Sequence, residues 1–187
     1  LAAEFEREDR LSEATSEQPD ALEVLAPDER QDHFHRRAVD EGRKINDIAE
    51  ARLAEAGFTV TGDARLAEAG IDFESRIVGP GGNEFWIELA GSFVTSRPGL
   101  LRPDAIWKVL GKLHLLAELR PGARAIVLTS NVPRPGSPGH KALRAIGQGV
   151  LFDVIELYDP AALRRLAIYS EDESPEPLPG FWPVAKV

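Results

Sequence analysis

Residues 70–93 show the clearest alternation of apolar and polar positions in the chain. Successive side chains of an extended strand point to opposite faces, so Ile71 and Phe73 would share one face and Asp72 would lie on the other. Residues 84–90 alternate in the same way, and the Gly-Pro-Gly-Gly-Asn segment between the two runs favours a tight reversal. The pattern predicts a β-hairpin that brings Asp72 and Glu88 close together on one surface.

Other segments have the spacing of amphipathic helices. Apolar residues of 32–56 fall near one stripe that ends at Gly57, and residues 103–119 have a second stripe, with Pro103 in the first turn. Shorter helices are predicted at 140–146 and at 160–169, the latter capped by Asp159. These segments would cover the faces of a sheet.

Three further strands are predicted, at 58–61, 125–129 and 150–157. The run at 125–129 is continuously apolar, which is typical of a strand buried on both faces. The order α-β-β-β-α-β-α-β-α predicts an α/β fold with a mixed central sheet flanked by helices. The heptapeptide Ala-Arg-Leu-Ala-Glu-Ala-Gly occurs at both 51–57 and 64–70, and we interpret this repeat as chance because no other self-similarity accompanies it.

The chain divides into one domain and two acidic ends. With 187 residues and 43% apolar content it can bury one good core, which we assign to residues 31–170. Residues 1–30 are interpreted as an acidic linker or frayed helix, and residues 171–187 as an acidic, Pro-rich tail in which Phe181 and Trp182 could dock. Because the chain begins at Leu1 and contains no Met, we expect it to be a fragment of a longer polypeptide.

Composition excludes several kinds of site. The chain has no Cys, which removes disulfides and thiolate ligands, and its four His are scattered. No run of 18 apolar residues exists, so we expect a soluble, cytoplasmic protein without membrane association. These features leave oxygen ligands as the donors for any metal.

The charge is distributed unevenly. The formal net charge is −9, yet residues 89–144 hold nine Lys and Arg against only Asp104 and Glu118. A local excess of positive charge suits a phosphate backbone. The candidate nucleic-acid-binding residues are Arg97, Arg102, Lys112 and Arg134.

Two carboxylates on neighbouring strands provide what a hard divalent cation such as Mg²⁺ requires, because it prefers oxygen ligands and keeps waters for a substrate phosphate. Asp72 and Glu88 are therefore candidate metal ligands. The alternative is that both residues decorate a solvated sheet face, which is common for acidic residues on strands.

The element order and the hairpin resemble the PD-(D/E)XK nuclease superfamily, most closely its Mrr-like restriction endonuclease branch. The similarity covers about residues 42–168 and rests on Gly-Ile-Asp-Phe at 70–73, Ile-Glu-Leu-Ala at 87–90 and the strands at 125–130 and 152–157. It implies a restriction-endonuclease-like core and a Mg²⁺- or Mn²⁺-dependent DNA endonuclease, with a possible role in restriction or defence. In this resemblance Asp72 and Glu88 are the metal ligands.

One departure from the family pattern affects the chemistry. The family's lysine, which orients the attacking water, stands two residues after the second ligand, and this position is Ala90 here. We expect Lys108 to replace it as a catalytic residue, ahead of Lys112, Arg97 and Arg102. The alternative is a catalytically inactive module of the same fold that binds DNA or a protein partner. An RNA substrate, an upstream domain or partner subunit, and a homodimer remain open.

Overall fold

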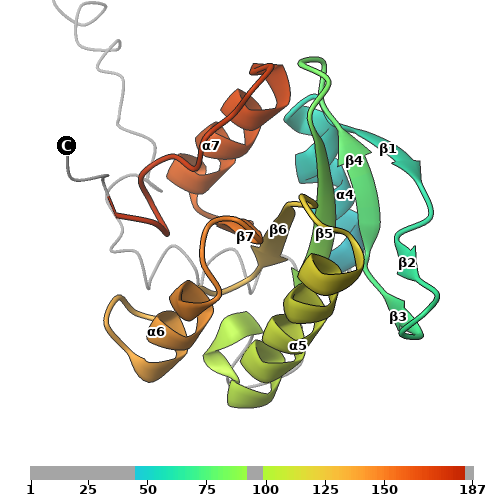
Figure 1. Cartoon of the computed structure of the whole chain (residues 1–187). Coiled ribbons are helices and arrows are strands. Elements are labelled where there is room, and N and C mark those ends of the chain that lie inside the picture. Colours follow the sequence, from blue (N-terminus) through green and yellow to red (C-terminus); the bar gives the residue numbers. More distant parts are fainter. Residues whose placement is uncertain (1–44, 92–98, 184–187) are drawn as a thin grey trace, which may run out of the picture. The chain divides into compact units, whose positions relative to one another are not determined.

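A five-stranded mixed sheet forms the centre of the protein (Figure 1). The computed structural model describes residues 45–91 and 99–183. Strand order is β1-β4-β5-β6-β7; β1, β4 and β5 pair antiparallel, whereas β5, β6 and β7 run parallel. The strands of this sheet are β1 (Thr59–Gly62), β4 (Ser75–Val78), β5 (Glu84–Ala90), β6 (Ala125–Thr129) and β7 (Leu151–Glu156). The described part is therefore an α/β fold with a mixed sheet, which confirms the predicted class at this level.

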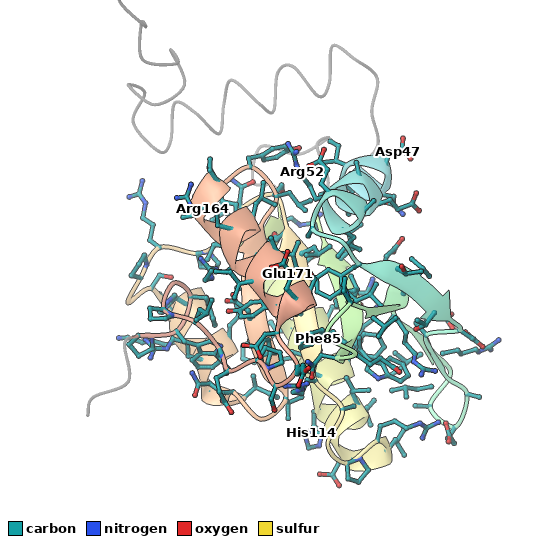
Figure 2. The ribbon with its side chains drawn as sticks, turned by 90° about the horizontal axis from the view of Figure 1, so that it is seen from above. Asp47, Arg52, Phe85, His114, Arg164 and Glu171 are labelled. Carbon is teal, nitrogen blue, oxygen red and sulfur yellow. The ribbon has the colours of Figure 1, made fainter. Side chains whose placement is uncertain are left out.

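Helices cover both faces of the sheet. The helical elements are α4 (Ile45–Glu55), the short 3₁₀ helix η1 (Gly99–Leu101), α5 (Pro103–Leu119), α6 (Pro138–Ala145) and α7 (Pro160–Glu171). Helices α5 and α6 pack on the face that carries Trp86 and Val127, and α4 and α7 lie over the other face, where Phe85, Phe152 and Tyr169 are in ring contact. Figure 2 shows this layering, with Phe85 in the interior and Arg164 at the surface.

Helix α5 and strand β6 follow the predicted bounds. Pro103 occupies the first turn of α5, where its missing N–H costs nothing, and the helix buries Ile106, Val109, Leu113 and Leu116. All five residues of β6 are buried, since the strand lies between two parallel neighbours and under helices on both faces. The α6, β7 and α7 bounds differ from the predictions by at most two residues. The 3.6-residue periodicity and the continuous apolar run were therefore sufficient to predict where these elements begin and end.

The hairpin is confirmed only in part. Strands β4 and β5 pair antiparallel from Ser75 opposite Ile87 to Val78 opposite Glu84. Residues 71–72, however, do not continue β4: they form β3 (Ile71–Asp72), which pairs with β2 (Arg65–Leu66) in a separate two-stranded ribbon. The chain changes its strand partner between two consecutive residues. The amide of Phe73 donates to the carbonyl of Ala64, and the amide of Glu74 donates to the carbonyl of Ile87 in β5. The prediction of one uninterrupted strand was wrong.

The C-terminal segment docks on the domain. Phe181 and Trp182 are buried, and the indole Nε1 of Trp182 donates to the carbonyl of Phe152 at 2.9 Å. The amide of Leu178 donates to the hydroxyl of Tyr169 at 2.8 Å. Phe181 and Trp182 thus pack against the domain, as the sequence allowed, and helix α7 continues to Glu171.

The predicted helix at 32–56 is described from Ile45 to Glu55, and its earlier part, like the linker at 1–30, lies outside the described residues. In the ranges 45–91 and 99–183, no helix combines the length and apolar character needed to cross a bilayer.

Candidate functional site

A cavity of about 280 Å³ opens between the C-terminal half of β5 and the first turns of α5. It is bordered by strand residues, by η1 and by one flank of the helix. The lining residues are Glu88, Leu89, Ala90, Gly91, Gly99, Arg102, Asp104, Ala105, Lys108 and Val109. Its wall thus combines an acidic strand residue with basic helix residues.

Glu88 is the acidic group of this site. Strand β5 lies in the middle of the sheet under α5, so the alternation of the strand turns Glu88 toward the helix and leaves it only 3% exposed. Burial raises the pKa of the Glu88 carboxyl, and this effect exceeds the opposing hydrogen bond and charge of Lys112. A carboxyl held in this way can exchange a proton closer to neutrality than an exposed glutamate.

Lys112 is the partner of Glu88. Its Nζ lies 2.6 Å from Oε2 of Glu88 and 2.7 Å from the main-chain carbonyl oxygen of Asp72. The ammonium also lies 5.4 Å from the ring centre of Phe73, within the range of a cation–π contact. Two oxygens and an aromatic face therefore hold one buried positive charge against β5.

Asp72 contributes to this cluster through its main chain. Its carboxylate is 72% exposed and lies 3.5 Å from Nε of Arg65, its register partner in the ribbon of β2 and β3. The change of strand partner at residues 73–74 carries the Asp72 side chain off the main sheet, which sequence alternation alone does not reveal. Asp72 and Glu88 thus contact the same ammonium, that of Lys112. Glu88 does so through its carboxylate, and Asp72 through its main-chain carbonyl.

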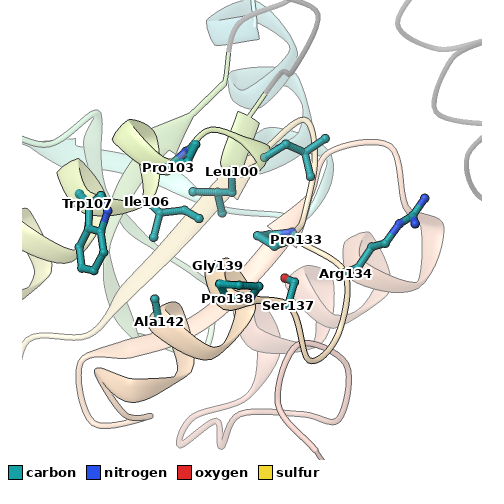
Figure 3. Close-up of a pocket in the computed structure, with 11 residues that line it drawn as sticks. Leu100, Pro103, Ile106, Trp107, Pro133, Arg134, Ser137, Pro138, Gly139 and Ala142 are labelled. Atoms are coloured by element: carbon teal, nitrogen blue, oxygen red, sulfur yellow. The ribbon is translucent and has the colours of Figure 1, made fainter.

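Two of the other basic candidates, Lys108 and Arg102, line the cavity. Lys108 is exposed and lines the cavity; burial raises the pKa of Glu88, and the positive charge of Lys108 reduces that rise. Arg102 lines it too, but its Nε is bonded to Asp104 at 3.1 Å. Arg134 borders a separate apolar groove (Figure 3), and Arg97 falls outside the described residues.

Two contacts were missed by the sequence analysis. Lys112 was predicted to contact nucleic acid and ranked behind Lys108 as the replacement lysine, yet it is the lysine that reaches Glu88. Lys108 lies one turn earlier and is exposed. The (i, i+4) spacing places both on one flank of α5 and does not say which one lies over β5. Glu74 is the second contact. Burial is the main cause of the raised Glu88 pKa, and the negative charge of Glu74 raises that pKa further. Glu74 itself accepts a hydrogen bond of 3.0 Å from the side-chain amide of Asn46.

The oxygens around Lys112 include hard donors of the kind that Mg²⁺ accepts, namely the Glu88 carboxylate and the Asp72 carbonyl. Within the described residues no three His, Cys, Asp or Glu side chains converge into a metal-holding group. A divalent ion here would depend on two protein oxygens, water and substrate phosphate, which is common for Mg²⁺.

The chain matches no protein-family model, no curated protein and no solved structure.

Proposed function

We propose that the protein is a metal-dependent endonuclease that hydrolyses phosphodiester bonds of DNA, in the manner implied by its resemblance to the PD-(D/E)XK superfamily. The observation that carries the proposal is the buried pair of Glu88 and Lys112 at the edge of a cavity with basic residues. A buried carboxylate next to a lysine is the acid–cation pair that such chemistry uses. It arises here even though the family's lysine position is Ala90.

The chain's residues divide the work as follows. Glu88 would hold Mg²⁺ or Mn²⁺ together with the main-chain carbonyl oxygen of Asp72, the two oxygens that the Lys112 ammonium contacts here. Lys108 would contact the substrate phosphate from its exposed position on the cavity wall. When bound, the ion supplies Lewis-acid chemistry, lowering the pKa of a water and neutralising charge on the phosphoryl oxygens. Lys112 would release the Glu88 and Asp72 oxygens to the ion and donate a hydrogen bond from its ammonium to the attacking water.

Lys112 replaces Lys108 as our candidate for the missing lysine. Its ammonium already contacts Glu88, and the small side chain of Ala90, two residues along the same strand face, leaves space in the cavity. A cation in this position needs a defined distance to the metal ligand rather than a particular place in the sequence. The 2.6 Å contact between Lys112 on α5 and Glu88 on β5 supports this choice.

A second candidate, a nuclease-fold module that binds DNA without cleaving it, is favoured by one observation. The ammonium of Lys112 lies between the Glu88 carboxylate and the Asp72 carbonyl, and the Asp72 carboxylate pairs with Arg65. A site neutralised in this way has less need of a metal ion. The experiment below separates the two functions.

The test is cleavage of supercoiled plasmid with Mg²⁺ or Mn²⁺, with and without chelator. We expect Glu88→Ala to abolish cleavage and Lys112→Met to reduce turnover by on the order of 10²-fold while DNA affinity falls far less. Lys141→Met, which removes an exposed lysine of α6, is the matched control and should cleave normally. All variants are assayed below their melting transitions.

Two further measurements test the roles. Ala90→Lys in the Lys112→Met background should recover part of the lost rate, because it restores one ammonium beside Glu88. Mn²⁺ should raise the melting temperature of the wild type but not of Glu88→Ala. No metal-dependent cleavage by wild type or by Ala90→Lys, with DNA binding retained, would establish the inactive module instead.

A further inference from the structure

A second concavity lies on the other side of the first turns of α5. This apolar groove has a volume of about 440 Å³ and is formed by η1, α5, α6 and the loop before α6 (Figure 3). Its lining residues are Leu100, Leu101, Pro103, Ile106, Trp107, Pro133, Arg134, Ser137, Pro138, Gly139 and Ala142. The volume falls in the range of sites that enclose small ligands.

Trp107 is exposed at one end of this groove. Its side chain is 65% exposed, and it is absent from the core cluster that the rest of α5 forms with the sheet. Leu101, also exposed, lines the same groove, whereas Ile106 and Leu100 are buried. Large apolar side chains gathered in an open concavity indicate a binding surface rather than a requirement of the fold.

The groove and the Glu88 cavity share one wall. Consecutive residues at the start of α5 alternate between them: Pro103 and Ile106 line the groove, while Arg102 and Lys108 line the cavity. A chain molecule with a phosphate at Glu88 would reach the groove by crossing the first turns of α5. Together the two concavities make a two-part surface around the first turns of α5, with charged residues in the cavity and mainly apolar ones in the groove.

The charge around this surface favours a polyanion. The basic residues that line the two concavities are Arg102, Lys108 and Arg134, and the acidic ones are Glu88 and Asp104. One of the two acids, Asp104, is held by Arg102. Nucleic acid combines the two features that the surface complements, an anionic backbone and flat apolar bases.

We propose that the groove receives one unstacked base of a DNA strand whose backbone crosses the Glu88 cavity, with Trp107 as the stacking surface. The proposal deepens the nuclease function and rests on it for the position of the backbone. It gives the preferred substrate as DNA with an unpaired base, because a base that is already unstacked enters the groove without the energy needed to open a pair. Aromatic stacking tolerates any base, so little sequence preference is expected.

The experiment measures binding without cleavage. The 187-residue chain is titrated in EDTA into two fluorescein-labelled duplexes that differ by one bulged 2-aminopurine, and anisotropy gives both Kd values. We expect tighter binding to the bulged duplex, with 2-aminopurine fluorescence quenched in the complex. Trp107→Ala should weaken binding to the bulged duplex by roughly 5- to 100-fold, as for loss of one base–aromatic stack, and leave the paired duplex nearly unchanged. Trp107→Phe should retain most of the preference.

Ile168→Ala is the matched control, because Ile168 is an exposed large apolar residue on α7, outside the groove. Its affinities should equal those of the wild type. Three outcomes would overturn the base pocket. They are equal affinity of the wild type for both duplexes, equal weakening of both complexes by Trp107→Ala, and no DNA binding. A change in the sedimentation of Trp107→Ala alone, with DNA binding intact, would assign the groove to contact between copies and would also overturn it.

Failure of this proposal is distinguishable from failure of the nuclease function. Plasmid cleavage without any preference for the bulged duplex would remove only the base pocket. A Trp107-dependent preference without metal-dependent cleavage would remove only the nuclease activity and leave a module that binds unpaired bases.

Discussion

Replacing Lys112 by Met removes the ammonium that compensates the buried carboxylate of Glu88. The side chains of Glu88 and Lys112 are 4% and 16% exposed, so water cannot readily take the place of the lysine. Breaking a buried pair by deleting one partner costs about 3–5 kcal/mol when the remaining charge stays ionised. Met retains most of the apolar stem, so the change isolates the charge.

Glu88 can avoid this cost by taking up a proton. Neutralising a glutamate at pH 7 costs about 1.4 kcal/mol for each pH unit above its ordinary pKa of about 4.3, or about 4 kcal/mol. Because burial already raises the pKa of Glu88 in the folded wild type, part of this cost is present before the mutation. We therefore expect Lys112→Met to lower the free energy of unfolding by at most about 3–4 kcal/mol at pH 7. The same arithmetic gives about 1 kcal/mol at pH 5.

The sign of the pH dependence follows from the pKa of Glu88. Burial raises this pKa in the folded wild type, so the stability linked to Glu88 is full below the unfolded value and is lost as pH rises toward the folded pKa. Lys112 limits that rise through its hydrogen bond and charge. Without Lys112 the pKa of Glu88 in the folded state rises further, which widens the pH range between its unfolded and folded pKa values. The free energy of unfolding should therefore fall more steeply between pH 5 and pH 8.

Urea unfolding at pH 5, 7 and 8 measures this difference, and the carboxyl carbon resonance of Glu88 reports its pKa directly. Lys108→Met is the matched control; because Lys108 is exposed, its effect should stay within about 0.5 kcal/mol at each pH. Glu88→Gln with Lys112→Met should restore the wild-type slope or a shallower one. Parallel pH profiles of Lys112→Met and wild type would refute the buried pair.

Two further predictions concern stability. Gly111→Ala should raise the free energy of unfolding by about 0.5–1 kcal/mol, because Gly111 lies inside α5 and an added Cβ meets nothing within 4 Å; a lower thermal midpoint would contradict this. Tyr169→Phe should cost about 1–3 kcal/mol in urea unfolding, since the buried hydroxyl donates to Asp153 at 3.0 Å and accepts from Leu178 at 2.8 Å. An unchanged midpoint would show that this hydroxyl does not anchor the C-terminal segment.

The elements that periodicity specifies strongly could be predicted from sequence. Helix α5 and strand β6 follow from local patterns, a wide apolar stripe after Pro103 and a continuous apolar run at 125–129. The α/β class follows from their order. Glu88 could be singled out as well, because alternation along 84–90 and the reversal before it place its carboxylate on a strand next to the preceding run.

The partners of these elements could not be predicted in the same way. The heptapeptide Ala-Arg-Leu-Ala-Glu-Ala-Gly ends α4 at 51–57, yet at 64–70 it forms β2 and a turn. Its first copy continues a helical stripe that packs on the sheet, whereas the second lies beside β3 and pairs with it. Identical local propensity thus produced two structures, because packing outweighs a propensity of a few tenths of a kcal/mol per residue.

The candidate site depends on the tertiary structure for the same reason. Alternation along 70–78 predicts that the Asp72 carboxylate faces Glu88, but the change of partner at Phe73 and Glu74 turns it toward Arg65. The crossing of α5 over β5 selects Lys112 rather than Lys108 as the residue in contact with Glu88. The sequence by itself determined which residues are acidic, basic or apolar and the period on which they recur. Only the tertiary structure decided which charges meet. The contacts of Lys112 join residues 24 and 40 positions apart, and they depend on strand pairing and helix packing, which local patterns do not specify.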